Sequence, residues 1–409
     1  MKICVFKSAN GGVAFYRSIQ PYTYLKKYFD IFLYDYEQHH PFFMREWSEI
    51  ADVIVYQMPW GRAIAEAIKT NKERVNPKKI IVEFDDNIFG VSPFNNAYAK
   101  FGQEEIQNCF LDKPSIERMI KMGYPRSKPG ENTLKQLSIA GINPNNAYVV
   151  DLWKDGERDF NLKRNLEDAE WTKYTIANAD VVTCTNYELG KQLRKYRPKG
   201  EIAIMPNLIN TERWLPMKDN DTDYIRIGWQ GGDAHFLDLL QIMPALDKVF
   251  TKHKNVKFVT MGGYFPSLFT DPIYKDRYEH TMWHGDIYTY PLAVRDMKCD
   301  IMIAPLIDDK FNRSKSELKW LEYSLLKVPG VYSPIVYSDS VKHGKTGLIA
   351  ENTNDWEKYL NQLIESKELR KEIANKAYTR VSTYHNVNQA DAYKDMIYNL
   401  MSKELRKAA

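Results

Sequence analysis

The chain has 409 residues, which is too long for one ordinary domain and predicts two or three. Hydrophobic residues make up 44% of it, enough for sizeable cores, and the formal net charge of +4 neither requires nor excludes a polyanionic partner. The four cysteines are scattered without a C-x-x-C pair. This spacing argues against a zinc site or a disulfide framework and fits a reducing compartment.

The N-terminal residues 1–7 contain only a short apolar run before charge and glycine return, so they indicate a first strand and not a signal peptide. No apolar run approaches the roughly 18 residues that span a bilayer. We therefore expect a cytoplasmic protein without a transmembrane segment.

Short, β-branched apolar runs alternate with helical stretches along most of the chain, which predicts parallel sheets built from βαβ units. The pattern occurs twice, ending near Asn210 and resuming at Tyr224, with a polar, turn-rich linker over residues 211–223. Examples of such strands are Lys2–Phe6, Asp52–Tyr56, Lys79–Phe84, Asp180–Cys184, Ile202–Met205, Ile225–Trp229, Lys257–Thr260 and Asp300–Ala304.

The predicted fold class is therefore α/β, with two Rossmann-like doubly wound domains facing each other across a cleft, where ligands bind at the carboxyl ends of strands. We place the first domain at residues 1–212 and the second at 222–385, followed by a C-terminal helix over 386–409 that packs back on the first domain. Residues 99–160 interrupt the strand–helix rhythm with proline, glycine and asparagine clusters. An insertion of this length is more typical of a lid or an acceptor-binding element than of a linker.

Two glycine pairs follow predicted strands, and we expect them to face each other across the cleft. Gly11 and Gly12 follow the first strand, and Gly231 and Gly232 follow Ile225–Trp229 and precede His235 and a helix. Such a turn lets a phosphate or sugar approach the backbone closely, although it can also serve only to reverse the chain.

Two further candidates lie on the side of the first domain. Arg17, on the helix after Gly12, is placed to meet an anion or to form a surface salt bridge. Asp85 and Asp86 end the strand Lys79–Phe84, where carboxylates suit general-base catalysis, hydroxyl binding or metal binding, or form an Asx-turn.

The segment from Phe311 to Tyr323 carries the strongest signal. Ser314 and Glu317 stand in the S-x-x-E relation of a capping box, so they predict a helix N-terminus there, with Lys315 beside it. A helix N-terminus and a lysine attract phosphate, and Glu322 lies about two turns further along the helix. The pattern predicts a site that binds a diphosphate at the N-terminus of the helix and a ribose further along it, beside Glu322. The alternative is an ordinary capped amphipathic helix with no ligand.

Together, these segments resemble the retaining GT-B glycosyltransferases of family four (glycosyl transferases group 1), over most of the chain. The run from Ser314 to Gly330 resembles the family's E-x7-E helix, with Glu322 as the second glutamate. The segment His343–Asn352 resembles the family's glycine-threonine-glycine turn, and the other matching segments are Ala179–Asn186, Met205–Asn210, Trp283–Ile287 and Cys299–Pro305.

The resemblance implies an acceptor-side first domain, a nucleotide-sugar-binding second domain, transfer with retention, and neither a catalytic metal nor a cofactor. It implies that Glu322 binds the donor ribose and that the turn at Gly285 and Ile287 binds the base. Ser314 stands where the family has its first glutamate, so Lys315 or Ser316 is expected to substitute in contacting the sugar.

Two more departures from the family pattern concern catalysis. No arginine–lysine pair follows Gly231 and Gly232, which makes Lys315 the best candidate for stabilising the diphosphate leaving group. Asp85 stands where the family has a histidine, and we expect Asp85 or Asp86 to orient the acceptor hydroxyl or accept its proton.

The predicted function is transfer of a sugar from a nucleotide diphosphate sugar to an acceptor hydroxyl, on a glycan or cell-surface polymer or on a modified base in DNA. The alternatives are a nucleotide-sugar epimerase of the same fold and a non-catalytic protein that binds sugar nucleotides or nucleic acid. Basic and aromatic residues of and near the insertion are available for a phosphate backbone: Arg126, Lys128, Trp153, Lys154, Arg158 and Arg164.

Overall fold

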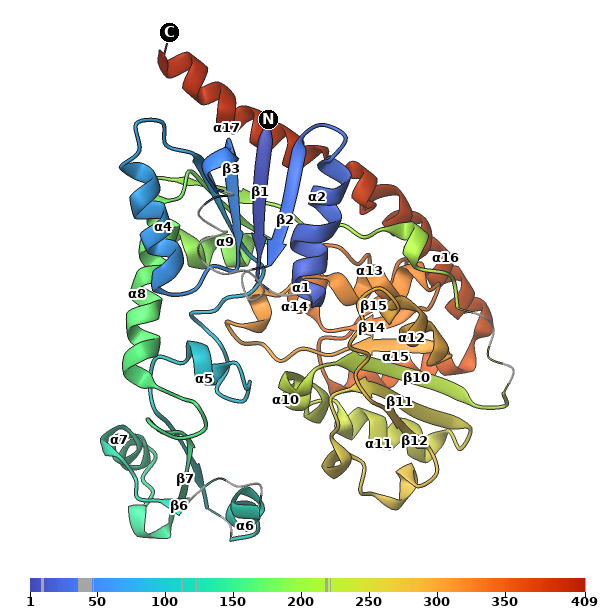
Figure 1. Cartoon of the computed structure of the whole chain (residues 1–409). Helices are drawn as coiled ribbons and strands as arrows, with labels where there is room; N and C mark the ends of the chain where they lie inside the picture. Colours follow the sequence, from blue (N-terminus) through green and yellow to red (C-terminus); the bar gives the residue numbers. More distant parts are fainter. Residues whose placement is uncertain are drawn as a thin grey trace. The chain divides into compact units, whose positions relative to one another are not determined.

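The computed structural model describes residues 1–8, 11–35, 46, 48–111, 113–121, 124, 126–217, 220 and 222–408 (Figure 1). It divides into two compact units. One unit comprises Met1–Asn87 and Thr172–Ala409, and the other comprises Ile88–Trp171. The larger unit holds two six-stranded sheets.

The first sheet has the strand order β2-β1-β3-β4-β8-β9, and every pairing in it is parallel. Its central strands are rich in valine and isoleucine because both faces are covered, as parallel sheets require. The strands are β1 (Lys2–Lys7), β2 (Asp30–Asp35), β3 (Val53–Gln57), β4 (Lys79–Phe84), β8 (Val181–Cys184) and β9 (Glu201–Ile204).

The helices associated with this sheet include an irregular first one, in which a π-helical turn at Phe15–Ile19 separates two α-helical pieces. They are α1 (Gly12–Ala14), α2 (Gln20–Leu25), α4 (Arg62–Lys72), α8 (Leu162–Asn178), which continues from the smaller unit, and α9 (Tyr187–Arg194).

The second sheet has the order β12-β11-β10-β13-β14-β15, also parallel throughout. Its strands are β10 (Ile225–Gly231), β11 (Val256–Gly262), β12 (Tyr278–Thr281), β13 (Ile301–Ala304), β14 (Gly330–Tyr332) and β15 (Leu348–Ile349). Its helices are α10 (Phe236–Leu240), α11 (Met243–Lys252), α12 (Tyr290–Asp296), α13 (Leu318–Leu325), α14 (Pro334–Tyr337), α15 (Thr353–Glu365) and α16 (Lys367–Tyr384).

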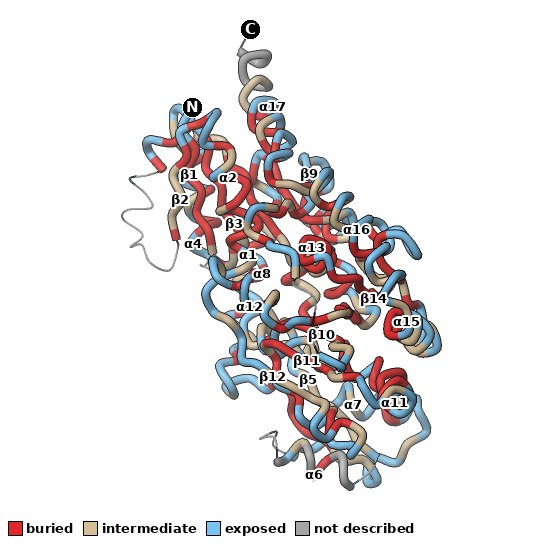
Figure 2. Tube along the Cα trace, turned by 90° about the vertical axis from the view of Figure 1, so that its right-hand side faces the viewer, coloured by how far each residue is buried: buried red, intermediate tan, exposed pale blue. Residues whose placement is uncertain are grey.

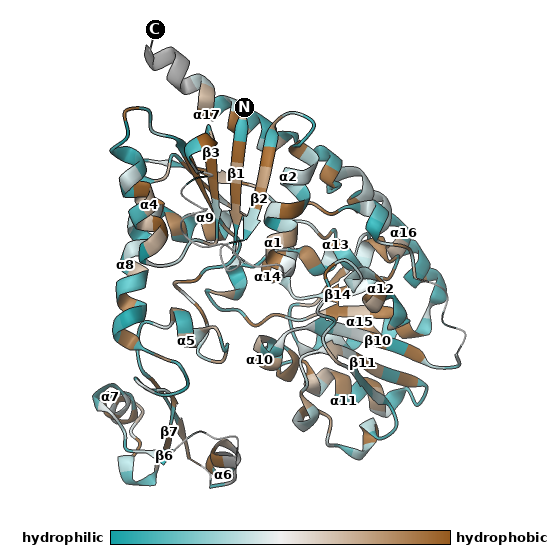
Figure 3. Ribbon diagram, in the orientation of Figure 1, coloured by the Kyte–Doolittle hydropathy of each residue, from teal (hydrophilic) through white to brown (hydrophobic). Residues whose placement is uncertain are grey.

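Each sheet has its own buried core. Much of the chain around the sheets is buried in Figure 2, and β1 and β3 are largely hydrophobic in Figure 3. A third core cluster joins the two domains. It contains Phe15 and Tyr16 from the first domain together with Trp320 and Leu321 from α13. The first helix is therefore packed on the second domain.

The C-terminal helix α17 (Asp391–Ala408) returns to the first domain (Figure 1). Its residues Tyr393 and Ile397 are buried in the same cluster as Ile3 and Val5 of β1. The hydrophobic spacing of four residues explains this packing, because positions i and i+4 share one helix face.

The smaller unit, Ile88–Trp171, is wider than the insertion predicted at 99–160 and has its own three-stranded sheet of order β5-β7-β6, paired antiparallel. Tyr98, Trp153 and Phe160 pack together, with ring centroids 5.5–6.0 Å apart. Its elements are α5 (Tyr98–Phe101), β5 (Ile106–Phe110), α6 (Lys113–Lys121), β6 (Arg126–Ser127), α7 (Glu131–Ile139) and β7 (Tyr148–Trp153).

The predicted strands all form, with ends shifted by up to two residues. The two sheets contain four further strands beyond these examples, β2, β12, β14 and β15. Short 3-10 turns lie at Pro144–Asn146, Thr211–Arg213, Asp233–His235, Pro266–Leu268, Pro272–Tyr274, Asn312–Ser314 and Val387–Gln389.

Candidate functional site

A cavity of about 360 Å³ lies where the carboxyl ends of the two sheets meet. In each sheet the strands are added first to one side of the initial strand and then to the other. This switch in strand order lies between β1 and β3 in the first sheet and between β10 and β13 in the second, and doubly wound folds bind ligands at such a point. A Cβ atom placed on Gly12 would lie 3.9 Å from Cδ1 of Ile287, so the first glycine turn faces the second domain closely.

Every site residue predicted from the sequence lines this cavity except Ser314. The lining members of that set are Gly11, Gly12, Arg17, Asp85, Asp86, Gly231, Gly232, His235, Gly285, Ile287, Lys315, Ser316 and Glu322. The cavity volume falls within the range of small-molecule sites.

The capping box at Ser314 and Glu317 was a wrong prediction. Residues Asn312–Ser314 form a 3-10 turn, Lys315 is extended, and α13 begins only at Leu318 with Glu317 as its N-cap residue. The Ser314 hydroxyl is buried and donates to the carbonyl of Lys310 at 3.0 Å, so it is turned away from the cavity.

Local polar contacts explain why the helix starts late. The backbone amide of Asn312 donates to Oδ1 of Asp309 at 2.6 Å, and its side chain donates to Oδ1 of Asp238 at 3.0 Å. Asp and Asn side chains that bond nearby backbone favour turns over helix, and here they hold the chain in a turn. Ser316 is then free to accept a 2.8 Å hydrogen bond from Asn207 of the first domain.

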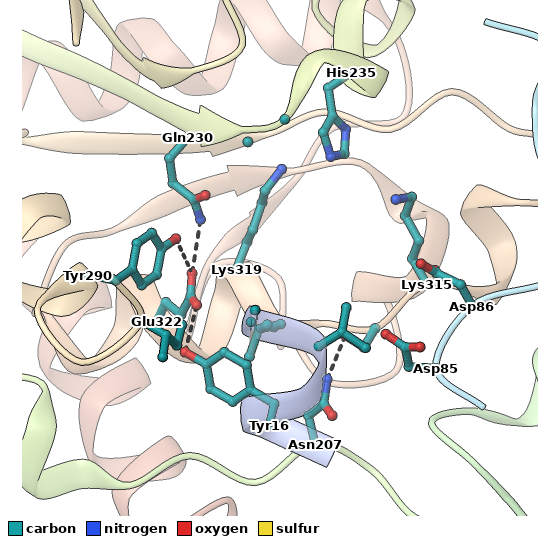
Figure 4. Close-up of a pocket in the computed structure, with 18 of the residues that line it drawn as sticks. Tyr16, Asp85, Asp86, Asn207, Gln230, His235, Tyr290, Lys315, Lys319 and Glu322 are labelled. Atoms are coloured by element: carbon teal, nitrogen blue, oxygen red, sulfur yellow. Dashed lines mark hydrogen bonds between the residues drawn. The ribbon is translucent and has the colours of Figure 1, made fainter. Parts of the chain in front are cut away.

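Glu322 is a buried carboxylate at the inner end of the cavity, 2% exposed. Tyr16 donates to its Oε1 at 2.8 Å, while Gln230 and Tyr290 donate to its Oε2 at 2.9 and 3.3 Å (Figure 4). Burial raises the pKa of Glu322 to about 7, and the hydrogen bond from Tyr16 and the charge of Lys319 oppose this rise. None of the three donors was predicted.

Two lysines bring positive charge into the cavity. Lys315, which was predicted, lies with its Nζ 4.6 Å from the centroid of the Phe311 ring. Lys319, which was not predicted, lies in the first turn of α13, and its buried Nζ has no hydrogen-bond partner among the described residues. Burial, followed by repulsion from Lys315, lowers the pKa of Lys319 to about 8.

The turn after β10 forms the wall opposite these lysines. A Cβ atom on Gly231 would lie 2.7 Å from the Trp229 ring, so only glycine fits there, whereas a Cβ atom on Gly232 would meet nothing within 4 Å. His235 bonds Oδ2 of Asp238 through Nδ1 at 2.6 Å. Burial, followed by repulsion from Lys319, lowers the pKa of His235 to about 3, so this imidazole is neutral near pH 7.

Asp85 and Asp86 line the side of the cavity that belongs to the first domain. Oδ1 of Asp85 is buried and has no hydrogen-bond partner in the described part of the chain. Burial, followed by the neighbouring charges of Asp86 and Glu83, raises the pKa of Asp85 well above its usual value. A carboxylate with a raised pKa is a stronger proton acceptor.

Arg17 lines the cavity, and its ion pair is buried, which contradicts the surface salt bridge that was one of its two predicted roles. Its Nε is 2.7 Å from Oε1 of Glu83, and both side chains are 1% exposed. Nη1 donates to the carbonyl of Met205 at 2.6 Å and to Asn207 at 3.0 Å. With most of its donors used internally, Arg17 holds β4, the first helix and the 205–207 loop together.

The turn Trp283–Ile287 borders the outer part of the cavity. Arg213, from the predicted linker, donates to the carbonyl of Tyr288 at 3.2 Å, also donates to that of Ile287, and lies 4.1 Å from the centroid of the Phe15 ring. These contacts of Arg213 hold the turn Trp283–Ile287 against the first domain. No motif in the sequence indicated that Arg213 has this role.

Among the described residues, no group of three or more histidine, cysteine, aspartate or glutamate side chains has the arrangement to hold a metal ion. Within the same described ranges, no helix combines the length and apolar character that crossing a bilayer requires.

Comparison with known proteins connects this geometry to one fold. No family model matches the sequence, and no curated protein matches it. Solved structures do match, and over the whole chain. Sucrose-phosphate synthase from Thermosynechococcus elongatus matches with a TM-score of 0.60 at 11% identity, covering 100% of both chains.

Two further structures agree. A glycosyltransferase from Rickettsia africae matches with a TM-score of 0.58 at 12% identity, covering 98% of each chain. Anabaena HepE in complex with UDP matches with a TM-score of 0.57 at 11% identity, covering 98% of this chain and 100% of that one. The chain therefore has the GT-B fold, as its sequence predicted, with two Rossmann-like domains and a cleft between them.

Proposed function

We propose that this protein is a glycosyltransferase that moves a sugar from a nucleoside diphosphate sugar to an acceptor hydroxyl. One observation carries the proposal: a buried carboxylate, two lysines and an open glycine turn converge in a single cavity at the carboxyl ends of both sheets. HepE, which shares this fold, has been solved with UDP and with UDP-glucose, and that supports a nucleotide sugar as the donor here.

The donor would lie along the second domain. Its diphosphate would meet Lys315 and the backbone at Gly231 and Gly232, where the open space next to Gly232 admits an oxygen atom. Its ribose would lie at Glu322, and its base beside the turn at Gly285 and Ile287. The order of these groups matches the order of a nucleoside diphosphate sugar.

The reaction breaks the bond between the anomeric carbon and the diphosphate oxygen, and the electron pair leaves with that oxygen. The acceptor hydroxyl forms the new bond to the same carbon and gives up its proton. Cations and backbone amides that are in place before the reaction stabilise the departing charge, which supplies a large part of the catalysis. Asp85 or Asp86 would orient the acceptor hydroxyl and take its proton.

We propose that transfer retains the anomeric configuration and needs no catalytic metal, as in the glycosyltransferases that the sequence resembles. Retention would be read from the anomeric signal of the product by NMR. Full turnover in the presence of EDTA would support independence from a metal, and loss of turnover that Mg²⁺ or Mn²⁺ restores would contradict it.

For the acceptor, contacts inside the smaller unit favour a glycan over DNA. Trp153 is 6% exposed and donates through Nε1 to the carbonyl of Pro93, and Arg158 lies 4.7 Å from its ring centroid. This ring is therefore packed internally and offers no face for a nucleic-acid base, which was one role predicted for it. Binding to duplex DNA at low salt would contradict this preference.

The experiment is a thermal-shift screen against nucleoside diphosphates and their sugars, because a ligand that binds only the folded state raises its melting temperature. The best donor is then incubated alone and with glycan acceptors. Transfer to an acceptor supports the proposal. An isomerised sugar formed without an acceptor would show an epimerase, and the absence of any nucleotide binding would overturn the proposal.

A further inference from the structure

Lys319 is an unusual cation, because its charge is buried and unmatched. Its Nζ atom is shielded from solvent and has no hydrogen-bond partner among the described residues. Burying an ammonium group without a hydrogen-bond partner is unfavourable, because the group loses its hydration and gains no direct contact in return. A protein tolerates that cost where a ligand supplies the missing counter-charge.

The carboxylates near Lys319 are already bonded to other groups. Oδ1 of Asp238 accepts from the amide of Ile307 at 2.7 Å and from Asn312 at 3.0 Å, and its Oδ2 bonds His235. Both oxygens of Glu322 likewise accept hydrogen bonds from neutral side chains. Their charges still attract the ammonium group of Lys319 through space, but neither forms an ion pair with it.

The ammonium group of Lys319 lies near an aromatic ring, and the residue lines the cavity. The Trp229 ring lies on one side, with its centroid 5.3 Å from Nζ. In Figure 4 the Lys319 side chain points toward the end of β10 and His235, while Lys315 lies on the side of the view where Asp85 and Asp86 are drawn. All of these residues except Trp229 line the cavity.

We infer that Lys319 is the catalytic residue that contacts the diphosphate of the donor and stabilises the departing oxygen, in place of the arginine–lysine pair that is missing after β10. This inference rests on the proposed function. Lys315 is then the second cation at this diphosphate, on the side nearer the carboxylates of the first domain. The ammonium group donates a charge-assisted hydrogen bond and transfers no proton.

The charges around Lys319 provide a test that does not depend on turnover. In the free protein, burial and Lys315 lower its pKa to about 8, while Asp238 and Glu322 oppose this shift; His235 is neutral. A bound diphosphate would raise the pKa of Lys319 again. Above pH 8 the free protein has partly lost this proton, so binding must take a proton up from the buffer.

The experiment is isothermal titration calorimetry of UDP, GDP and inorganic pyrophosphate at pH 8.5, in two buffers with different ionisation enthalpies. The wild type should take up protons on binding. Lys319→Arg should bind without proton uptake, because guanidinium stays charged at this pH. Lys315→Gln should reduce the uptake without abolishing it, because it leaves Lys319 in place but removes the repulsion that helps to lower the pKa of Lys319 in the free protein.

The predicted kinetic effect of Lys319→Gln is a loss of kcat of about a hundredfold to a thousandfold, as for removal of one charge-stabilising donor from an active site. Lys319→Arg should recover part of that loss. If the Gln variant fails to fold, the comparison of wild type with Lys319→Arg decides the question alone.

The outcomes separate the two proposals. Binding with equal proton uptake in wild type and Lys319→Arg would overturn the role of Lys319 and assign the proton to another group, such as Glu322. Failure of all three ligands to bind the wild-type protein, at pH 7 as well as at pH 8.5, would overturn the proposed function itself.

Discussion

Tyr16 of the first domain donates a 2.8 Å hydrogen bond to Oε1 of Glu322 in the second domain, across 306 residues of sequence. The bond uses one of the acceptor positions of the carboxylate that the proposed donor ribose would bind. Tyr16 lies in the π-helical turn of the first helix, a type of irregularity that is frequent at functional sites. The relation suggests that donor binding exchanges an interdomain hydrogen bond for a ligand hydrogen bond.

Tyr16→Phe should therefore bind nucleoside diphosphate more tightly than the wild type. The competing hydrogen bond is accepted by a carboxylate, and hydrogen bonds to a charged group are worth about 1.5–3 kcal/mol, so Kd should fall roughly tenfold to a hundredfold. Tyr290→Phe is the matched control, because Tyr290 bonds the other oxygen at 3.3 Å from within the second domain. Calorimetry measures both; equal affinity for Tyr16→Phe and wild type would argue against the exchange.

Glu322→Gln should mainly weaken donor binding and leave kcat much less affected. The substitution keeps the shape of the side chain but removes the charge that strengthens its hydrogen bonds. Hydrogen bonds to a charged group are worth about 1.5–3 kcal/mol, so Kd should rise roughly tenfold to a hundredfold. A steady-state analysis that shows unchanged KM and a reduced kcat would assign Glu322 to chemistry instead of binding.

Gly232→Ala should reduce donor affinity without lowering the melting temperature, because the new methyl group enters open space in the cavity. Gly231→Ala is its control for steric damage. Its Cβ atom would lie 2.7 Å from the Trp229 ring and 3.0 Å from His235, so it should lower the melting temperature as well. Wild-type nucleotide affinity in a folded Gly232→Ala protein would show that the diphosphate lies elsewhere.

The pH profile of turnover should lose activity on its acid side as Asp85 becomes protonated. Because burial, followed by Asp86, raises the pKa of Asp85, this acid limb should lie above the usual carboxyl range. Asp86→Asn removes a neighbouring negative charge, so it should move the limb to lower pH. Asp85→Asn should lower kcat strongly and remove the acid-side loss of activity from the pH profile. If Asp86→Asn and the wild type lose activity at the same pH, a group other than Asp85 is responsible for that loss.

Arg17→Ala should destabilise the protein strongly, by about 3–5 kcal/mol, because it leaves the buried carboxylate of Glu83 without its partner. Lys376→Ala is the comparison, since its pair with Glu372 is exposed and should contribute less than about 0.5 kcal/mol. Urea unfolding monitored by circular dichroism measures both. A small loss for Arg17→Ala would reopen its role as an anion ligand.

Local pattern was sufficient to predict the fold and most of the cavity wall. Continuous β-branched runs identify central parallel strands, and residues placed directly after such strands, including Gly231, Gly232, Asp85 and Asp86, must gather at the carboxyl edge of a sheet. This geometric rule depends only on position in the chain. The rule predicted that the two glycine turns and the two carboxylates would line one cavity, and they do.

The sequence by itself determined the two-domain α/β architecture, because hydrophobic periodicity and turn residues act over a few positions and do not need the rest of the chain. Only the tertiary structure decided that Tyr16 reaches Glu322, that Arg17 is paired with Glu83, and that the charge of Lys319 is buried without a partner. The reason is physical. Burial and pairing depend on which distant residues pack together, and no spacing between neighbours in the chain encodes that.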